Sequence, residues 1–160
     1  CTGPFLLTHL LADKLKASSP SRIINLVSPV FRRQPLNLSN LNLKEKYTYK
    51  IAYQNSKVAL VSFNLKMAEV FDGTGVSTYA AIPGVVDTSI QRYVTLSTWK
   101  KLMSHFTHWF QKTPESGCQT VLHCVLNSEI AGESGHVYRY AGDVIRAVRL
   151  QCLLLHSGNA

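Results

Sequence analysis

The hydrophobic positions of the chain switch between two patterns, one typical of helices and one typical of buried strands. Apolar residues recur every three to four positions in residues 5–17, which predicts a helix. Residues 22–27 and 76–82 are short, mostly apolar runs, which predict buried parallel strands. The other predicted elements are helices at residues 52–70 and 113–125 and a short strand at residues 135–140. This order predicts an α/β layer of about three parallel strands with helices on both faces.

The first of these helices should bury one face. Its expected apolar face consists of Phe5, Leu6, Leu10, Leu11 and Leu15, with the charged residues outside. Thr113 is expected to cap the helix that begins at Pro114, because a threonine oxygen can accept a hydrogen bond from the first turn and proline fits the first helical position.

Two later segments have amphipathic patterns of their own. Residues 90–111 are rich in aromatic side chains, including Trp99, Phe106 and Trp109. This segment is either a helix that covers an apolar substrate or touches a membrane surface, or a helix packed on the core. Residues 144–155 combine basic and apolar side chains and predict a last helix.

Length and composition are those of one globular domain. The chain has 160 residues, of which 46% are hydrophobic and 16% charged. Its net charge of +8 is scattered, which indicates a solvated basic surface or, alternatively, contact with an anionic membrane or a phosphorylated cofactor. No basic-aromatic motif accompanies this charge, so nucleic acid is not an expected partner. The four cysteines lack metal-ligand spacing, which favours reduced, buried thiols in a reducing compartment and no metal site.

Tyr53 and Lys57 carry the candidate chemistry. Because they are four residues apart in a predicted helix, they share one face and lie one turn apart. An ammonium held near a phenol favours the phenolate, which lowers the phenol's pKa from about 10 and lets it pass a proton near neutral pH. Taken alone, the pair would indicate only a surface tyrosine beside a solvated lysine. The flanking sequence therefore determines whether the pair is interpreted as a catalytic site.

The flanks follow the order strand, serine, helix with Tyr-x-x-x-Lys, strand, Pro-Gly. The first strand ends at Ser28, and Pro83-Gly84 and Thr88 follow the second. This order resembles the carboxyl-terminal half of a short-chain dehydrogenase/reductase (SDR), which implies part of a Rossmann-like, doubly wound parallel sheet. Three segments resemble the retinol dehydrogenase branch of this superfamily, including its SDR member 13-type proteins: residues 3–11, 19–25 and 112–120.

The resemblance implies roles for individual residues. Tyr53 would donate and accept the proton, Lys57 would assist it and hold the nicotinamide ribose, and Ser28 would hold the substrate oxygen. The implied cofactor-binding residues are Tyr53, Lys57, Pro83, Gly84, Val86 and Thr88. Ser28 can alternatively be a residue that caps the end of a strand. Val27 stands where the family often has a first serine, and the asparagine of the family's proton relay would precede Cys1.

The site for the adenosine and pyrophosphate of a nicotinamide cofactor is not expected in this chain. Such a site needs a glycine-rich turn between a strand and a helix, and neither G-x-x-x-G-x-G nor Asn-Asn-Ala-Gly occurs in the sequence. We therefore expect part of a longer protein, with residues 1–142 as the second half of a Rossmann-like domain and residues 143–160 as a divergent tail. The resemblance favours NADP(H) over NAD(H).

Two functions are compatible with these observations. The chain is either the catalytic part of an oxidoreductase for a lipophilic, retinoid-like alcohol and its aldehyde or ketone, or a non-catalytic fragment or isoform that acts through protein association. The resemblance implies a location in the cytoplasm or on the cytosolic face of the endoplasmic reticulum, with residues 90–111 as the candidate for membrane-surface contact. The strand at residues 22–27 should lack a neighbour on one side, and an exposed apolar edge favours self-association.

Overall fold

A four-stranded sheet organises the fold. The computed structural model of the chain describes residues 2–33, 36, 38–45, 47–84, 86, 113–139 and 143–145. The strands are β1 (Ser21–Leu26), β2 (Val76–Ile82), β3 (Val137–Arg139) and β4 (Asp143–Ile145), in the order β1-β2-β3-β4. The first three are parallel, and β4 pairs antiparallel with β3. The predicted set of three parallel strands is confirmed, with β1 at one edge of the described sheet.

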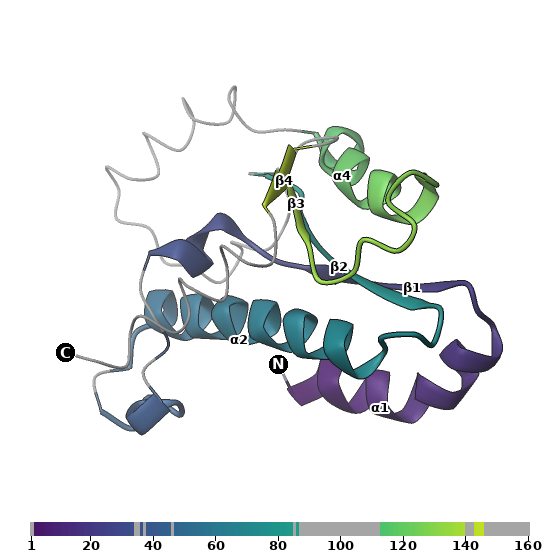
Figure 1. Cartoon of the computed structure of the whole chain (residues 1–160). Helices are drawn as coiled ribbons and strands as arrows, with labels where there is room; N and C mark the ends of the chain where they lie inside the picture. The colour runs from purple at the N-terminus through teal and green to yellow at the C-terminus, as the bar shows by residue number, and fades with distance from the viewer. Residues whose placement is uncertain are drawn as a thin grey trace.

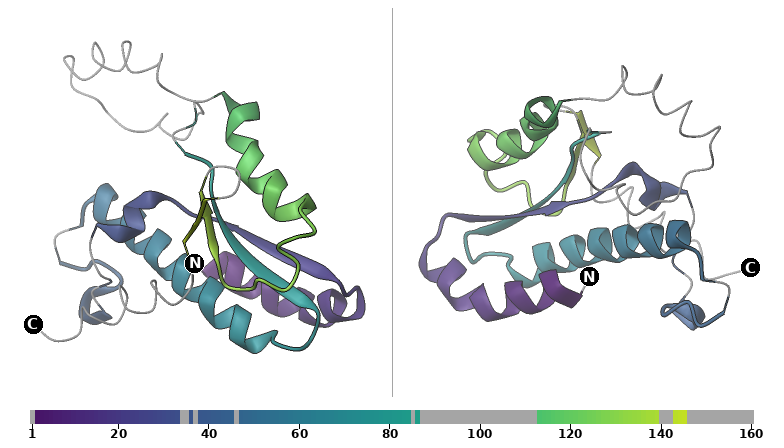
Figure 2. Two further views of the ribbon diagram at one scale, coloured as in Figure 1. Left: turned by 45° about the horizontal axis from the view of Figure 1, so that its top comes forward. Right: turned by 180° about the vertical axis from the view of Figure 1, so that it is seen from behind.

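Helices cover both faces of this sheet (Figure 1; Figure 2). On one face, α1 (Thr2–Ala17) and α2 (Tyr49–Val70) lie side by side, and α4 (Pro114–Leu126) lies on the other. Two 3₁₀ helices, η1 (Pro29–Arg32) and η2 (Leu38–Asn40), occur in the connection between β1 and α2. The arrangement is the partial Rossmann-like fold that was predicted.

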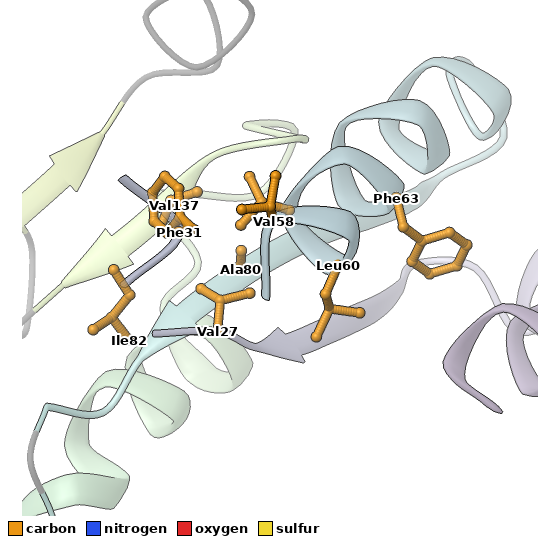
Figure 3. Packing of buried hydrophobic residues seen from close by; sticks show 9 residues of the cluster. Val27, Phe31, Val58, Leu60, Phe63, Ala80, Ile82 and Val137 are labelled. Atoms are coloured by element: carbon orange, nitrogen blue, oxygen red, sulfur yellow. The ribbon is translucent and has the colours of Figure 1, made fainter. Parts of the chain in front are cut away.

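β2 separates two hydrophobic clusters, because its side chains point alternately to the two faces of the sheet. Ala80 and Ile82 pack with Val58 of α2 on one face (Figure 3). Tyr79 packs with Cys124 of α4 on the other face. The cluster on the α2 face consists of Val27, Phe31, Val58, Leu60, Val61, Phe63, Ala80, Ile82 and Val137. This packing fixes α2 against the two strands that precede the candidate site.

The two helices α2 and α4 start with the same interaction. Thr48 Oγ1 accepts a hydrogen bond from the N–H of Ile51 at 3.2 Å, and Thr113 Oγ1 accepts one from the N–H of Ser116 at 3.2 Å. The predicted cap at Thr113 is confirmed. α2 begins before the predicted position 52, because the threonine cap defines its first turn.

The inward side of α1 differs from the predicted one. The exposed residues of the predicted face are Phe5, Leu6, Leu10 and Leu11. Thr8 is buried instead, and Leu15 is half-buried. The prediction of the buried face is therefore wrong except at Leu15. Apolar residues occur around most of this helix, so their spacing does not select the side that meets the sheet.

β4 occupies the position at which a helix was predicted to begin. Residues 143–145 form a strand, so the helical prediction is wrong for its first residues. Only three residues separate β3 from β4, and a connection that short can join two neighbouring strands only in antiparallel fashion. The predicted helix continues over residues 146–155, which lie outside the described residues.

Several other predictions also lie outside the described residues, namely those on Cys1, Thr88 and residues 90–111. Within the ranges that the structure describes, no helix is both long enough and apolar enough to cross a membrane.

The two described cysteines differ in their surroundings. Cys118 is exposed, Cys124 is buried in α4, and both are free thiols, so the prediction of buried thiols is wrong for Cys118, which lies on the solvent side of α4. Burial raises the pKa of Cys124 from 9.0 to about 11, against a smaller opposing effect of the Arg22 charge. Since this folded-state pKa is above the unfolded one, the stability linked to the protonated thiol is present below pH 9 and is lost as the pH rises to about 11.

We expect thiol reagents to distinguish these two cysteines in the folded chain at pH 8. Iodoacetamide should label Cys118 readily, whereas Cys124 should react at least about a hundredfold more slowly than in urea, because the thiolate is the nucleophile and its fraction falls about tenfold for each unit of pKa. Tandem mass spectrometry of the labelled chain measures both rates. Equal labelling of Cys118 and Cys124 without urea would contradict the buried position of Cys124.

Candidate active site

The candidate site lies at the edge of the sheet where β1 and β2 end. The N–H of Val27 donates a hydrogen bond to the carbonyl oxygen of Ala81 at 2.9 Å, so the two chains remain paired up to this edge. Ser28 follows on the first chain, and Pro83 and Gly84 follow on the second. The carboxyl edge of the strands is where open α/β sheets bind their ligands.

Lys57 connects α2 to this edge. Its Nζ donates a hydrogen bond to the carbonyl oxygen of Leu26, the last residue of β1, at 2.9 Å. The same nitrogen lies 5.6 Å from the centre of the Tyr53 ring. Desolvation of the half-buried Lys57 side chain lowers its pKa below 10.5. The structure thus brings Tyr53 and Lys57 together beside the end of β1, and Tyr53, at 40% exposure, is accessible to a ligand.

Ser28 lies in the connection from β1 to η1. Its backbone is extended (φ −139°, ψ 148°), and its side chain makes no capping hydrogen bond to η1. Its carbonyl oxygen accepts a hydrogen bond from the N–H of Phe31 at 3.2 Å. Val27 and Phe31, on either side of Ser28, are buried in one cluster with Val58, the residue that follows Lys57. This packing holds the Ser28 segment against the part of α2 that carries the tyrosine–lysine pair.

The turn after β2 presents mainly backbone. Gly84 has a φ of 90°, a conformation that favours glycine. The Val86 side chain packs on α4, where a Cβ at Gly117 would lie 2.4 Å from Val86 Cγ2. The backbone around Gly84 and Val86, rather than the Val86 side chain, is therefore the part that can approach a cofactor. Of the residues predicted to bind cofactor, Thr88 lies outside the described residues.

The groups at this edge fit the nicotinamide end of a dinucleotide cofactor. A lysine ammonium has three N–H donors, and Lys57 uses one of them on Leu26, so two remain for ribose hydroxyls. The missing side chain at Gly84 allows a flat ring to approach the backbone. In the described part of the chain, no three His, Cys, Asp or Glu residues are grouped so that they could hold a metal ion.

Sequence reasoning missed two polar interactions near the site. One is the bond from Lys57 to the Leu26 carbonyl, since a main-chain acceptor leaves no signal in the side-chain pattern. The other is a buried hydrogen bond between Asn25 of β1 and Asn64 of α2, at 3.0 Å. A polar residue inside an apolar strand was the available signal for the second interaction, because buried amides require a partner.

Comparison with curated proteins gives several retinol dehydrogenases as relatives of this chain. No family model matches the chain. Retinol dehydrogenase 11 of Mus musculus is 39% identical over 133 residues, which are 83% of this chain and 41% of that protein. Retinol dehydrogenase 14 of Homo sapiens is 35% identical over 142 residues, covering 88% of this chain and 41% of that protein. Retinol dehydrogenase 12 of Homo sapiens is 37% identical over 136 residues, covering 85% and 42%. The chain thus spans about 41% of the length of these curated relatives.

Solved structures share the fold. The NADPH-bound carbonyl reductase from chicken fatty liver aligns with a TM-score of 0.61 and 22% identity, over 91% of this chain and 53% of that one. A 7α-hydroxysteroid dehydrogenase in complex with NADH and 7-oxo glycochenodeoxycholic acid aligns with a TM-score of 0.59 and 16% identity, over 91% and 52%. The chain belongs to the short-chain dehydrogenase/reductase family. Within this family it is a retinol dehydrogenase-like member that matches part of the length of its relatives.

Proposed function

We propose that the chain supplies the catalytic side chains of an NAD(P)-dependent oxidoreductase that interconverts a lipophilic alcohol and its aldehyde or ketone. The observation that carries this proposal is the position of Lys57, which lies 5.6 Å from the Tyr53 ring and is bound to the last carbonyl of β1. A cation and an accessible phenol beside the end of β1 support this proposal, because open parallel sheets bind their ligands at this edge.

The proposed mechanism assigns one task to each side chain. The hydride would come from, or go to, a nicotinamide cofactor when one is bound. In the direction of reduction, the Tyr53 hydroxyl gives its proton to the carbonyl oxygen of the substrate, and the phenolate takes a proton back in the direction of oxidation. The Ser28 hydroxyl donates a hydrogen bond to the same oxygen. The Lys57 ammonium, 5.6 Å from the Tyr53 ring, would stabilise the negative charge that develops on the phenol oxygen during the transfer, and its two remaining N–H donors would hold the nicotinamide ribose.

The cofactor and the substrate class rest on the similarity to the retinol dehydrogenases. We propose NADP(H) rather than NAD(H), with Pro83, Gly84 and the backbone of Val86 beside the nicotinamide, and a retinoid-like or other lipophilic substrate. The adenosine and pyrophosphate would be bound by a glycine-rich segment that this sequence does not contain.

A second candidate function is association without catalysis. It is favoured by the side of β1 that pairs with no strand among the described residues, and by the neighbouring helix α1, whose Leu6, Leu7 and Leu10 are 52%, 60% and 69% exposed. Exposed apolar side chains next to an unpaired strand edge are typical of contact surfaces. In this alternative the chain pairs with itself or with a related protein.

A joined enzyme distinguishes these two functions. The nucleotide-binding half of human retinol dehydrogenase 14 is placed before Cys1, and the purified product is tested with NADPH and all-trans-retinal. We expect NADPH to bind and retinal to be reduced, whereas acetaldehyde, a small polar control, should be a poor substrate. A folded, NADPH-binding joined enzyme that reduces neither compound would overturn the catalytic proposal, and reduction of acetaldehyde alone would overturn the substrate class.

A further inference from the structure

We propose that Asn25 and Asn64 are positioning residues for the tyrosine–lysine pair, through the buried hydrogen bond that they form between β1 and α2. This inference rests on the proposed function. It assigns a role to two side chains that touch neither substrate nor cofactor, and that act by fixing where Tyr53 and Lys57 stand relative to β1.

The two asparagines form a buried link between the strand and the helix. Asn25 Nδ2 donates a hydrogen bond to Asn64 Oδ1 at 3.0 Å, and the two residues are 7% and 0% exposed. Asn64 Nδ2 has no hydrogen-bond partner among the described residues, so this single bond offsets part of the cost of burying the two amides. Loss of the bond would add to that cost, and the pair therefore favours the arrangement of α2 on β1 in which the bond forms.

A second bond attaches the same point of α2 to the next strand. The Thr78 hydroxyl of β2 donates to the main-chain oxygen of Asn64 at 3.0 Å, and Thr78 is fully buried. The N–H of Thr78 in turn donates to Ser134 Oγ, in the segment before β3, at 3.0 Å. One turn of α2 is therefore held by directional bonds to both β1 and β2.

The position of this link explains its effect on the site. Leu26, the partner of Lys57, directly follows Asn25, and Asn64 lies seven residues after Lys57, about 10 Å along the helix axis. Two attachments separated along α2 fix both its translation and its rotation on β1. The apolar contacts of Val58 and Val61 are non-directional, so they allow α2 to slide slightly on the sheet. The hydrogen bonds are directional and restrict this sliding.

Acetylation of Lys57 tests the proposal on the full chain without any need for activity. The half-buried Lys57 amine, bound to the Leu26 carbonyl, should react slowly with N-hydroxysuccinimide acetate. The exposed Lys50 should react quickly, and so should Lys66, because its ion pair with Glu69 lies on the surface. In Asn25→Leu, Lys57 should become about tenfold more reactive, the factor expected when a hydrogen bond to a charged group is lost. Mass spectrometry of the digested chain measures the three rates.

Two further variants separate positioning from general loss of stability. Val61→Ala removes a buried side chain from the same helix but no hydrogen bond, so it should lower stability and leave Lys57 protected. If Asn25→Leu fails to fold, Asn25→Ser, which keeps a shorter polar group, provides the test, and its Lys57 rate should be intermediate. Unchanged protection in the folded Asn25 variants, or an equal loss of protection in Val61→Ala, would overturn the proposal.

Kinetics of the joined enzyme distinguish failure of the positioning role from failure of the proposed function. Asn25→Leu should lower kcat roughly ten- to hundredfold with little change in KM for retinal, because misplacing a catalytic group by about 1 Å has an effect of this size. An active joined enzyme whose kcat is unaffected by Asn25→Leu would refute the positioning role alone. An inactive joined enzyme in which Lys57 protection still depends on Asn25 would refute the catalytic proposal alone.

Discussion

Replacing Tyr53 by phenylalanine in the joined enzyme is expected to lower kcat for retinal reduction about 10²- to 10⁴-fold, the usual contribution of general acid–base catalysis. The substitution removes the hydroxyl and keeps the ring, and Tyr53 is 40% exposed, so packing is nearly unchanged. Binding of NADPH, followed by its fluorescence, should persist. Steady-state kinetics with retinal measure the loss.

The same helix provides a matched control for this substitution. Tyr49 lies one turn before Tyr53 and is 53% exposed, so Tyr49→Phe removes an equivalent hydroxyl outside the pair and should leave kcat within about twofold of the unchanged enzyme. If Tyr53→Phe keeps nearly full turnover with cofactor bound, Tyr53 is not the proton donor. The second candidate function, association without catalysis, is then favoured over the catalytic proposal.

Lys57→Met should lose a comparable amount of kcat and also weaken NADPH binding, because the ammonium acts on both the phenol and the ribose. Lys50→Met, an exposed lysine in the first turn of α2, is its control. Ser28→Ala should lower kcat less than Tyr53→Phe or Lys57→Met does. The Ser28 hydroxyl only orients the substrate oxygen, so its removal leaves the proton donor in place. A larger loss for Ser28→Ala than for Tyr53→Phe would assign the proton transfer to a different group.

The parts of the site that could be predicted are those encoded by local sequence. The Tyr53–Lys57 spacing sets their common face in any helix, and Thr113 followed by Pro114 sets a helix start. β2 was predicted with its observed bounds because a mostly buried run of seven residues between two turns leaves few alternatives. In these cases the pattern and the tertiary structure favour the same answer.

What could not be predicted depends on contacts between distant segments. The apolar residues of α1 surround the helix, and the neighbouring elements select Thr8 as the buried side chain. β4 forms because β3 offers it an edge, although its basic and apolar neighbours are typical of a helix. The acceptor of Lys57 is a carbonyl of β1, and the partner of Asn25 lies 39 residues further along the chain. Spacing along the chain carries no information about such pairs.

Tyr79→Ala should produce the largest loss of stability, about 3–5 kcal/mol in the free energy of unfolding, the range measured when buried aromatic residues are truncated. Tyr79 is fully buried between β2 and α4, and its ring meets Tyr138 edge to face with centres 5.8 Å apart. Its hydroxyl also donates a hydrogen bond to the carbonyl oxygen of Ile130 at 2.8 Å. Urea unfolding of the chain, followed by circular dichroism, measures the effect.

Tyr79→Phe separates the two contributions of this side chain. It keeps the ring and removes the hydroxyl, so it should cost about 0.5–1.5 kcal/mol, the net contribution of one hydrogen bond, because the Ile130 carbonyl still accepts a bond from the N–H of Glu133 at 3.0 Å. Tyr47→Ala removes a tyrosine that is 68% exposed and should change stability by less than about 0.5 kcal/mol. Because Tyr79 faces α4 while Ala80 faces α2, folded Tyr79→Phe should keep Lys57 protected from acetylation. Loss of that protection would mean that the two faces of the sheet are coupled and that the site is not held by the α2 face alone.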